Sequence, residues 1–220
     1  MKNPIHPTLK TEIIPLLLIV VSLIASVYFY LNFPERVPDH WNIKGEVDGY
    51  CSKGSGAFFL PIIYIGFYPL MLFIPMIDPK KERYEQFRKP YHMIKNSVIV
   101  FMTIIYFYTG LAGLGYHLFS INIILSLGLG ILFIVIGNYM GKVKSNWFCG
   151  IRTPWTLSNE EVWNKTHRLG GKVFVIMGLI MLSGMFLPVE IFFIIVIISA
   201  IFGSLIPVVY SYWLYRRITK

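Results

Sequence analysis

Long apolar runs separated by polar segments dominate the pattern along the chain. A helix needs about 20 apolar residues to cross the hydrocarbon core of a bilayer, and six runs come close to or exceed that length. They cover residues 13–31, 57–77, 97–118, 121–140, 173–189 and 191–214. Because backbone polar groups in lipid must find partners within their own segment, the pattern predicts an all-α fold, a polytopic bundle of six transmembrane helices.

The Lys and Arg residues between these runs predict the orientation of the bundle. All but three of the 20 Lys and Arg residues fall in the set of segments that includes both termini, and the other set holds only Arg36, Lys44 and Lys53. Since basic residues concentrate in cytoplasmic loops, we expect cytoplasmic termini and an external loop at residues 32–56. The first run exceeds the roughly 7 to 15 apolar residues of a signal peptide, so we interpret it as an uncleaved anchor.

The high share of hydrophobic residues changes how the positive net charge is interpreted. The chain is 55% hydrophobic and only 14% charged, with a formal charge of +9. In a soluble protein such a charge would raise the question of nucleic acid, but here basic cytoplasmic loops beside anionic lipid account for it. We therefore expect membrane lipids as partners and no direct contact with nucleic acid. Cys51 and Cys149 fall on opposite predicted faces, so they cannot form a disulfide with each other.

The runs as drawn contain no Asp, Glu, Lys or Arg, which argues against a proton relay or a charge-ringed channel. His117, near the end of the third run, is given no role. The prolines of the second run, Pro61, Pro69 and Pro75, are interpreted as packing accommodations. Small residues at spacings that allow close helix contact are Gly110, Gly113, Gly115, Ser126, Gly130, Gly137 and Gly141.

Two polar segments are too elaborate for simple connections, and they divide the chain. We predict a first unit at residues 1–96, with two transmembrane helices, the external loop 32–56 and a basic loop 78–96. A second unit, residues 97–220, has four helices and a cytoplasmic loop 141–172. The external loop is rich in turn-forming residues. Its Asp39, His40, Glu46 and Asp48 could in principle bind a cation, but turn capping and packing of Trp41 at the interface are favoured.

The cytoplasmic loop carries the most information. Ser158 followed by Glu161 has the spacing of a capping box, which predicts a helix from Asn159, with Glu161 and Lys165 as an i, i+4 pair. Its simplest placement is along the inner membrane surface. The tryptophans expected at headgroup depth are Trp147, Trp155 and Trp163.

This loop and its flanks resemble the SdpI family of bacterial membrane immunity proteins. The matching residues are Gly137-Asn138-Tyr139-Met140-Gly141, Asn146, Gly150-Ile151-Arg152-Thr153-Pro154-Trp155-Thr156-Leu157, Val162-Trp163 and Thr166-His167-Arg168. The external loop is similar to the domain often fused before that family, in Pro34, Pro38, His40-Trp41-Asn42, Gly45, Asp48-Gly49 and Ser52-Lys53. Together the two resemblances cover roughly residues 33–61 and 128–180.

The resemblance implies a protein of the bacterial plasma membrane that protects its cell against a secreted peptide toxin. It also implies a possible second role, the holding of a cytoplasmic transcriptional repressor at the membrane. It supplies no catalytic residue, cofactor or metal, and we expect none. A transporter or flippase for a peptide or lipid is the alternative, but no energy source is visible. An enzyme ranks lower because the loop has no recognisable catalytic motif.

The candidate partner-binding residues follow from these motifs. In the cytoplasmic segment they are Asn138, Asn146, Arg152, Thr153, Pro154, Trp155, Trp163, His167 and Arg168; in the external loop they are His40, Trp41, Asn42 and Asp48. Arg152 is expected to be the central polar group, because Pro154 restricts Thr153 to an extended conformation and so presents Arg152 from a rigid turn. The alternative is that Arg152 only ties the turn to backbone carbonyls.

Overall fold

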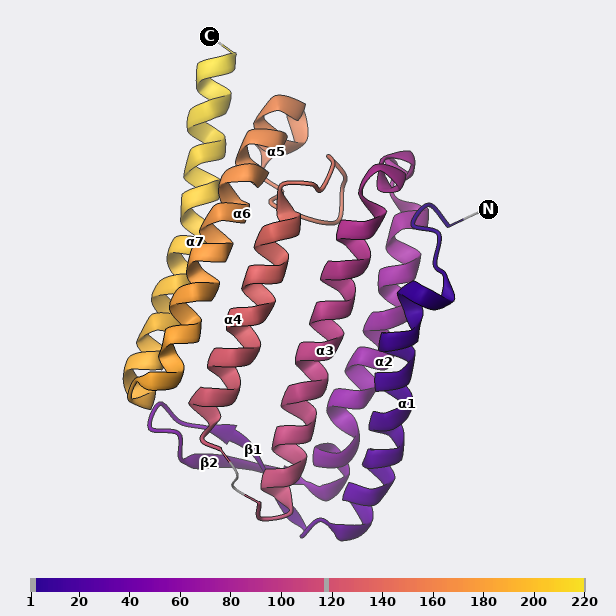
Figure 1. The fold of residues 1–220 in the computed structure, drawn as a ribbon, viewed down its shortest axis with the longest axis vertical. Helices are drawn as coiled ribbons and strands as arrows, with labels where there is room; N and C mark the ends of the chain where they lie inside the picture. The colour runs from indigo at the N-terminus through magenta and orange to yellow at the C-terminus, as the bar shows by residue number, and fades with distance from the viewer. Residues whose placement is uncertain (1–2, 117–118, 220) are drawn as a thin grey trace.

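The computed structural model describes residues 3–116 and 119–219 and shows a bundle of six long helices (Figure 1). These are α1 (Leu9–Asn32), α2 (Lys53–Ile77), α3 (Arg88–Gly113), α4 (Ile121–Met140), α6 (Glu160–Ser183) and α7 (Val189–Ile218). Three short helices are η1 (Lys81–Phe87), α5 (Pro154–Ser158) and η2 (Gly184–Phe186), and two strands are β1 (Arg36–Trp41) and β2 (Val47–Ser52). Six helical segments are long and apolar enough to cross a membrane, so the predicted fold class is confirmed.

The helices lie roughly parallel, with the loops gathered at two ends (Figure 1). One end carries both termini, η1 and the loop with α5, and the opposite end carries the β1–β2 hairpin. The segments assigned to one side by the count of Lys and Arg therefore share one end of the bundle. We call this end the basic end. That it faces the cytoplasm stays a prediction, as do the two units divided at residue 96. His117 lies outside the described residues.

Five of the six long helices begin earlier than hydropathy predicts, and the shift is largest for α3 and α6. α1 starts at Leu9, where Thr8 caps it by accepting from the backbone N–H of Thr11, and α3 starts at Arg88. The fifth spanning helix, α6, starts at Glu160 and includes the amphipathic segment predicted as a separate surface helix. That segment is continuous with the span because no proline interrupts it and the two intervening glycines, Gly170 and Gly171, pack closely against neighbouring segments. The predicted absence of charge inside the spans is wrong for these longer helices.

Glycines bring helices together, as their spacing predicted. Gly137 faces Gly171, and Gly130 faces Gly178; a Cβ at Gly171 would lie 2.6 Å from the Gly137 carbonyl oxygen, and one at Gly178 would lie 2.6 Å from that of Gly130. Helices α4 and α6 therefore touch through their backbones. In the other half, Gly110 of α3 leaves room for an aromatic ring of α1.

Tyr106 of α3 ties the first three helices together. Its hydroxyl lies 2.9 Å from the Ser26 hydroxyl of α1 and donates to the Ala57 carbonyl of α2 at 3.0 Å. The ring is buried and packs against Phe29 at 5.6 Å between centroids. Because a polar group in a membrane interior is costly without a partner, these bonds fix the packing of α1, α2 and α3 in one arrangement.

Orientation can be tested with cysteines, but the native ones are poor probes. Burial raises the pKa of the Cys149 thiol to about 11, and burial together with the Asp39 carboxylate raises that of Cys51. Since the thiolate is the reactive form, both should label slowly from either side. We therefore predict the outcome for new cysteines at exposed positions in a Cys51→Ala/Cys149→Ala background.

Lys44→Cys, at the hairpin turn, should react with a membrane-impermeant maleimide in intact cells, whereas Lys81→Cys, at the basic end, should react only after permeabilisation. Both side chains are in exposed positions, so access to solvent differs only by the membrane face. Labelling of Lys81→Cys in intact cells with protection of Lys44→Cys would invert the predicted topology.

Candidate functional site

Residues 32–56, the predicted external loop, contain an antiparallel hairpin, an arrangement that their turn-forming composition did not predict. Arg36 pairs with Ser52 and Trp41 with Val47, with an irregularity at Asp39. The side chain of Asn42 builds the turn, because its Oδ1 accepts from the backbone N–H groups of Lys44 (2.8 Å) and Glu46 (3.1 Å). Gly45 has a φ of +76°, which suits glycine.

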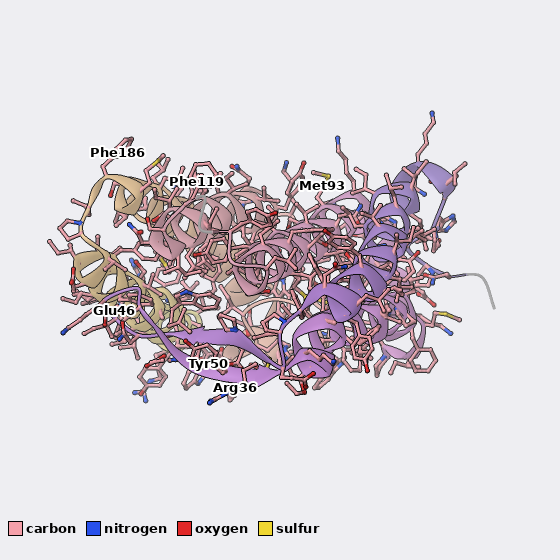
Figure 2. All side chains as sticks on the ribbon, turned by 90° about the horizontal axis from the view of Figure 1, so that it is seen from below. Arg36, Glu46, Tyr50, Met93, Phe119 and Phe186 are labelled. Carbon is pink, nitrogen blue, oxygen red and sulfur yellow. The ribbon has the colours of Figure 1, made fainter. Side chains whose placement is uncertain are left out.

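The hairpin lies across one end of the bundle (Figure 2), with Glu46 toward the tan helix α7 and Arg36 toward the purple helices. At its base Val37 is 1% exposed and packs with Phe33 of the first loop. At its tip, a Cβ on Gly45 would lie 3.4 Å from Val189 and 3.6 Å from Ile121. The hairpin therefore bridges the two halves of the bundle.

Of the four candidate residues of the hairpin, two pair with each other. His40 Nδ1 lies 2.5 Å from Asp48 Oδ1, with both side chains exposed. Asn42 donates to Glu46 Oε2 at 3.1 Å. Within the described residues, no group of three or more His, Cys, Asp or Glu side chains is arranged to hold a metal ion. The Asp48 and Glu46 carboxylates bond to neighbouring side chains. The predicted turn capping by Asp is wrong, because Asn42 caps the turn instead.

Beneath the hairpin lies an apolar cavity of about 580 Å³, which we call the hairpin pocket. Its walls come from the hairpin and from α2, α3, α4 and α7: Val37, Pro38, Asp39, His40, Trp41, Cys51, Ser55, Gly56, Phe59, Leu60, Ile105, Thr109, Ile121, Leu125 and Phe193. Its size and apolar lining are typical of a binding site with a few polar groups. Sequence reasoning found Trp41 and His40 but missed the helical walls, because they are far apart in the sequence.

At the basic end, residues 141–159 form what we call the signature loop, and Asn146 organises its first turn. Asn146 is 0% exposed. Its Oδ1 accepts from the backbone N–H groups of Phe148 (2.9 Å) and Cys149 (2.6 Å). Its Nδ2 donates to the carbonyls of Lys144 (2.8 Å) and Cys149 (3.0 Å). Asn146 is therefore a structural residue of the loop.

Asp78, at the end of α2, attaches the signature loop to the first half of the chain. One of its oxygens accepts from the Trp147 backbone N–H and from the Tyr84 hydroxyl, both at 2.9 Å, and the other accepts from the Lys80 N–H at 2.7 Å. The carboxylate is 2% exposed. Lys80 Nζ donates to the Ser145 hydroxyl at 2.8 Å. Sequence reasoning missed Asp78, which looks like an ordinary helix-ending residue.

His167 fixes the middle of the loop from α6. It is 0% exposed, its Nε2 accepts from the Ile151 N–H and its Nδ1 donates to the Trp163 carbonyl, both at 2.9 Å. A neutral ring with its proton on Nδ1 is the form that makes both bonds. A Cβ at Gly150 would lie 2.3 Å from His167 Nε2, and Gly150 has a φ of +105°, so the motif requires glycine there.

Trp163 is also fully buried, which corrects the prediction that it lies at headgroup depth. It stacks on His167 at 4.0 Å, and its Nε1 donates to the Val143 carbonyl at 2.8 Å. Because α6 begins at Glu160, the first turn of that helix points Trp163 into the bundle. Trp147 is 46% exposed and Trp155 is half-buried beside Tyr212, with 5.0 Å between ring centroids.

The predicted capping box at Ser158 is wrong by one residue. Asn159 caps α6 by accepting from the N–H groups of Glu161 (2.9 Å) and Val162 (3.1 Å). Ser158 instead ends α5 and donates to the Trp155 carbonyl. Asn and Ser are nearly equal as caps, and the sequence did not reveal the preceding short helix. The Glu161–Lys165 pair is present at 2.6 Å.

Thr153, Pro154 and Arg152 form the turn that leads into α5. Thr153 is extended and caps α5, with Pro154 as the first helical residue, and its hydroxyl lies 3.0 Å from that of Ser211 in α7. Arg152 donates from one guanidinium nitrogen to the Trp147 carbonyl at 2.8 Å and is exposed. Arg152 therefore makes the bond to a backbone carbonyl that the alternative interpretation of this residue predicted. The rest of its side chain remains exposed.

Asn138 and Arg168 lie away from this network, on the outer face of α4 and α6. Both are exposed and line a separate open groove. The structure thus divides the candidate residues into four groups: hairpin residues, buried loop-building residues such as Asn146 and His167, loop residues that reach the surface, and two residues of an outer groove. The loop residues at the surface are Arg152, Pro154 and Trp155.

A buried ion pair inside the bundle was missed altogether. Glu12 of α1 pairs with Lys95 of α3, and the two are 6% and 0% exposed. Thr11 donates to Glu12 at 2.9 Å, Lys95 lies over the Tyr68 ring at 5.1 Å from its centroid, and His92 Nδ1 lies 3.2 Å from Glu12. Two charges buried inside a helical bundle are tolerated only because they neutralise each other.

Comparison with known proteins agrees with the motifs. The profile of the SdpI/YfhL protein family matches residues 142–211, which contain all of the signature loop except Gly141, all of α6 and most of α7. This part of the chain is therefore similar to the SdpI/YfhL protein family. A domain of unknown function, DUF1648, matches residues 17–65, which contain the hairpin and one wall of the hairpin pocket.

The SdpI/YfhL match does not stand alone. The chain is 28% identical over 210 residues to the Immunity protein SdpI of Bacillus subtilis (strain 168), across 96% of this chain and 98% of that protein. No solved structure matches. The six helices long and apolar enough to cross a membrane indicate a multi-pass membrane protein. The chain is similar to the Immunity protein SdpI over nearly the whole length of both proteins.

Removing one member of the buried ion pair should be costly. Lys95→Met leaves the Glu12 carboxylate unpaired in the interior, and we expect a loss of about 3–5 kcal/mol of folding stability. Glu12→Gln/Lys95→Met should recover most of that loss, because no buried charge remains. Thermal unfolding in detergent would measure both.

The matched control is Lys165→Met, which breaks the exposed pair with Glu161 and should cost about 0.5 kcal/mol or less. Equal losses for Lys95→Met and Lys165→Met would show that solvent screens Glu12 and that the pair is not a buried one.

Proposed function

We propose that the protein protects a bacterial cell against a secreted, membrane-active peptide toxin and that the hairpin pocket receives an apolar part of that peptide. The observation that carries the proposal is the end-to-end similarity to the Immunity protein SdpI, combined with an apolar pocket at the end of the bundle predicted to be external. The second matched segment, residues 17–65, contributes the hairpin side of this pocket.

The chemistry of the pocket favours apolar and aromatic contact over attraction by charge. The wall residues are mostly apolar, with Trp41 at the hairpin side, where its ring lies 5.7 Å from that of Tyr108. Nearby charges are used locally, since Lys53 pairs with Glu35 at 2.8 Å. Burial of a few large side chains supplies most of the binding energy in such sites, so a peptide with aromatic or branched aliphatic residues fits best.

Catalysis is not expected at the signature loop. The histidine beside it, His167 of α6, is buried with both ring nitrogens bonded to backbone groups, so it has no nitrogen left to accept a proton from a substrate. One guanidinium nitrogen of Arg152 donates to a backbone carbonyl of the loop itself. Transport is less well supported than binding, because the charges of Glu12 and Lys95 inside the bundle satisfy each other.

We further propose that the signature loop is the surface that holds a cytoplasmic transcriptional repressor. Its fold is fixed by buried bonds through Asn146, Asp78 and His167, while Trp147 and Phe148 remain 46% and 37% exposed. A rigid turn that presents two aromatic rings beside a guanidinium has the composition of a protein-binding surface.

Filling the hairpin pocket should abolish protection. Leu125→Trp places a large ring in the cavity, so the peptide is excluded and the toxin concentration that the cells survive should fall about tenfold or more. Leu127→Trp, on the exposed side of the same helix, is the matched control and should protect fully. The measurement is survival of a toxin-sensitive bacterial host at matched protein abundance.

Trp41→Ala should likewise reduce protection more than Glu46→Gln. If the unmodified chain protects the cells and both Leu125→Trp and Trp41→Ala protect them fully, the immunity function would stand. The proposal that the pocket receives the peptide would then be wrong.

Arg152→Lys tests the proposed repressor surface. Lysine keeps a positive charge and one donor but loses the planar fork, so protein abundance and protection should stay unchanged while induction of a reporter behind this gene's own promoter is lost. Arg83→Lys, which alters the bidentate pair with Glu160, is the control and should leave induction intact. A parallel fall of abundance and induction in Arg152→Lys would mean that the residue only builds the loop.

A further inference from the structure

The outer groove between α4 and α6 has a composition that neither the hairpin pocket nor the signature loop explains. It encloses about 660 Å³ at the basic end of the bundle. We call it the basic groove. Its lining residues are Gly137, Asn138, Gly141, Lys142, Arg168, Gly171, Lys172, Val175 and Ile176. It includes Asn138 and Arg168, the two motif residues that lie outside the loop network.

The glycines make this place hollow. Gly137 and Gly171 bring α4 and α6 together with no side chain between them. A Cβ at Gly141 would lie 3.5 Å from Arg168, so Arg168 rests beside the end of α4. The floor is therefore backbone, and the side chains that rise from it belong to the rims.

The rims carry positive charge without a counter-charge. Lys142, Arg168 and Lys172 are all exposed, and within the part of the chain that the structure describes, no carboxylate lies within ion-pair distance of any of them. Asn138 adds an uncharged amide to the same groove. Three cations and an amide around a backbone floor are complementary to a phosphate group.

The groove also has an apolar end. Val175 and Ile176 line it on the side toward the middle of α6, and Ile176 is 56% exposed on the outer surface. Eight residues of helix separate Arg168 from Ile176, which corresponds to about 12 Å along the axis. That length joins the headgroup level to the upper part of the acyl chains, since interfacial regions add several ångströms on each side of the hydrocarbon core.

We propose that the basic groove is a binding site for an anionic phospholipid, with the phosphate held by Lys142, Arg168, Lys172 and Asn138 and the start of an acyl chain lying against Val175 and Ile176. The groove opens on the lateral surface of spanning helices, where lipid is the neighbouring molecule. A soluble phosphate would use the cations but not the apolar end. The proposal does not depend on toxin immunity.

The test uses the full-length protein in detergent with phosphatidylglycerol or phosphatidylcholine added. Native mass spectrometry should show one retained phosphatidylglycerol in preference to phosphatidylcholine, and thermal unfolding should shift upward with phosphatidylglycerol. Lys142→Gln/Arg168→Gln/Lys172→Gln should weaken phosphatidylglycerol binding about tenfold or more. Asn138→Leu changes no charge, yet should weaken binding about fivefold by removing one hydrogen bond.

The matched control is Lys81→Gln/Arg88→Gln/Lys89→Gln, which removes the same charge from exposed positions at the same end and should keep binding within about twofold. If both triple variants weaken phosphatidylglycerol binding equally, general attraction between charges would explain the binding and the groove would not be a specific site. Equal retention of the two lipids, or equal stabilisation by inorganic phosphate, would likewise overturn a phospholipid site. Protection is not the readout, so failure here is distinct from failure of the immunity proposal.

Discussion

Direct backbone contact between α4 and α6 determines the form of the whole basic end. The glycine pairs Gly137–Gly171 and Gly130–Gly178 leave no space for a side chain between the two helices. Because the end of α4 and the start of α6 are so close, residues 141–159 must fold back over the bundle instead of spanning a gap. The close approach brings His167 and Trp163 beneath that loop, where they bond to Ile151 and Val143. The same missing side chains hollow the basic groove on the outer face.

Helix α2 links the two regions with candidate functions. Its first turns line the hairpin pocket with Ser55, Gly56 and Phe59, and the residue after its last turn, Asp78, binds the signature loop. The Tyr106 hydroxyl holds the same helix near its start, because it donates to the Ala57 carbonyl of α2 and also bonds to the Ser26 hydroxyl of α1. A displacement of α2 at the pocket would therefore reach Asp78 through one continuous element. This physical connection is what a protein that couples peptide binding to a response at the other end requires.

Properties that depend on neighbouring residues were predictable, and those that depend on distant partners were not. Hydropathy found all six spans because each span is a local property of about 20 residues. The motif around Arg152 and Thr153 correctly indicated an extended Thr153, since Pro154 acts on its immediate neighbour. The hairpin pocket was beyond reach because its walls come from segments as distant as Val37 and Phe193. Trp163 was misplaced for a related reason: its burial depends on α6 starting at Glu160.

The Glu12–Lys95 pair shows why hydropathy also misplaced the helix ends. A hydropathy window stops at the first charged residue, because a single charge in lipid is expensive. These two residues lie 83 positions apart in the sequence, so neither reveals the partner that makes it tolerable. Thr8 is the local signal that the window ignores, since its capping box places the start of α1 before Glu12. Once α1 begins there, Glu12 faces α3, and only a cation at that height can occupy the opposite position. The ion pair therefore adds another polar contact, besides the bond between Tyr106 and Ser26, that sets the register of α1 against α3.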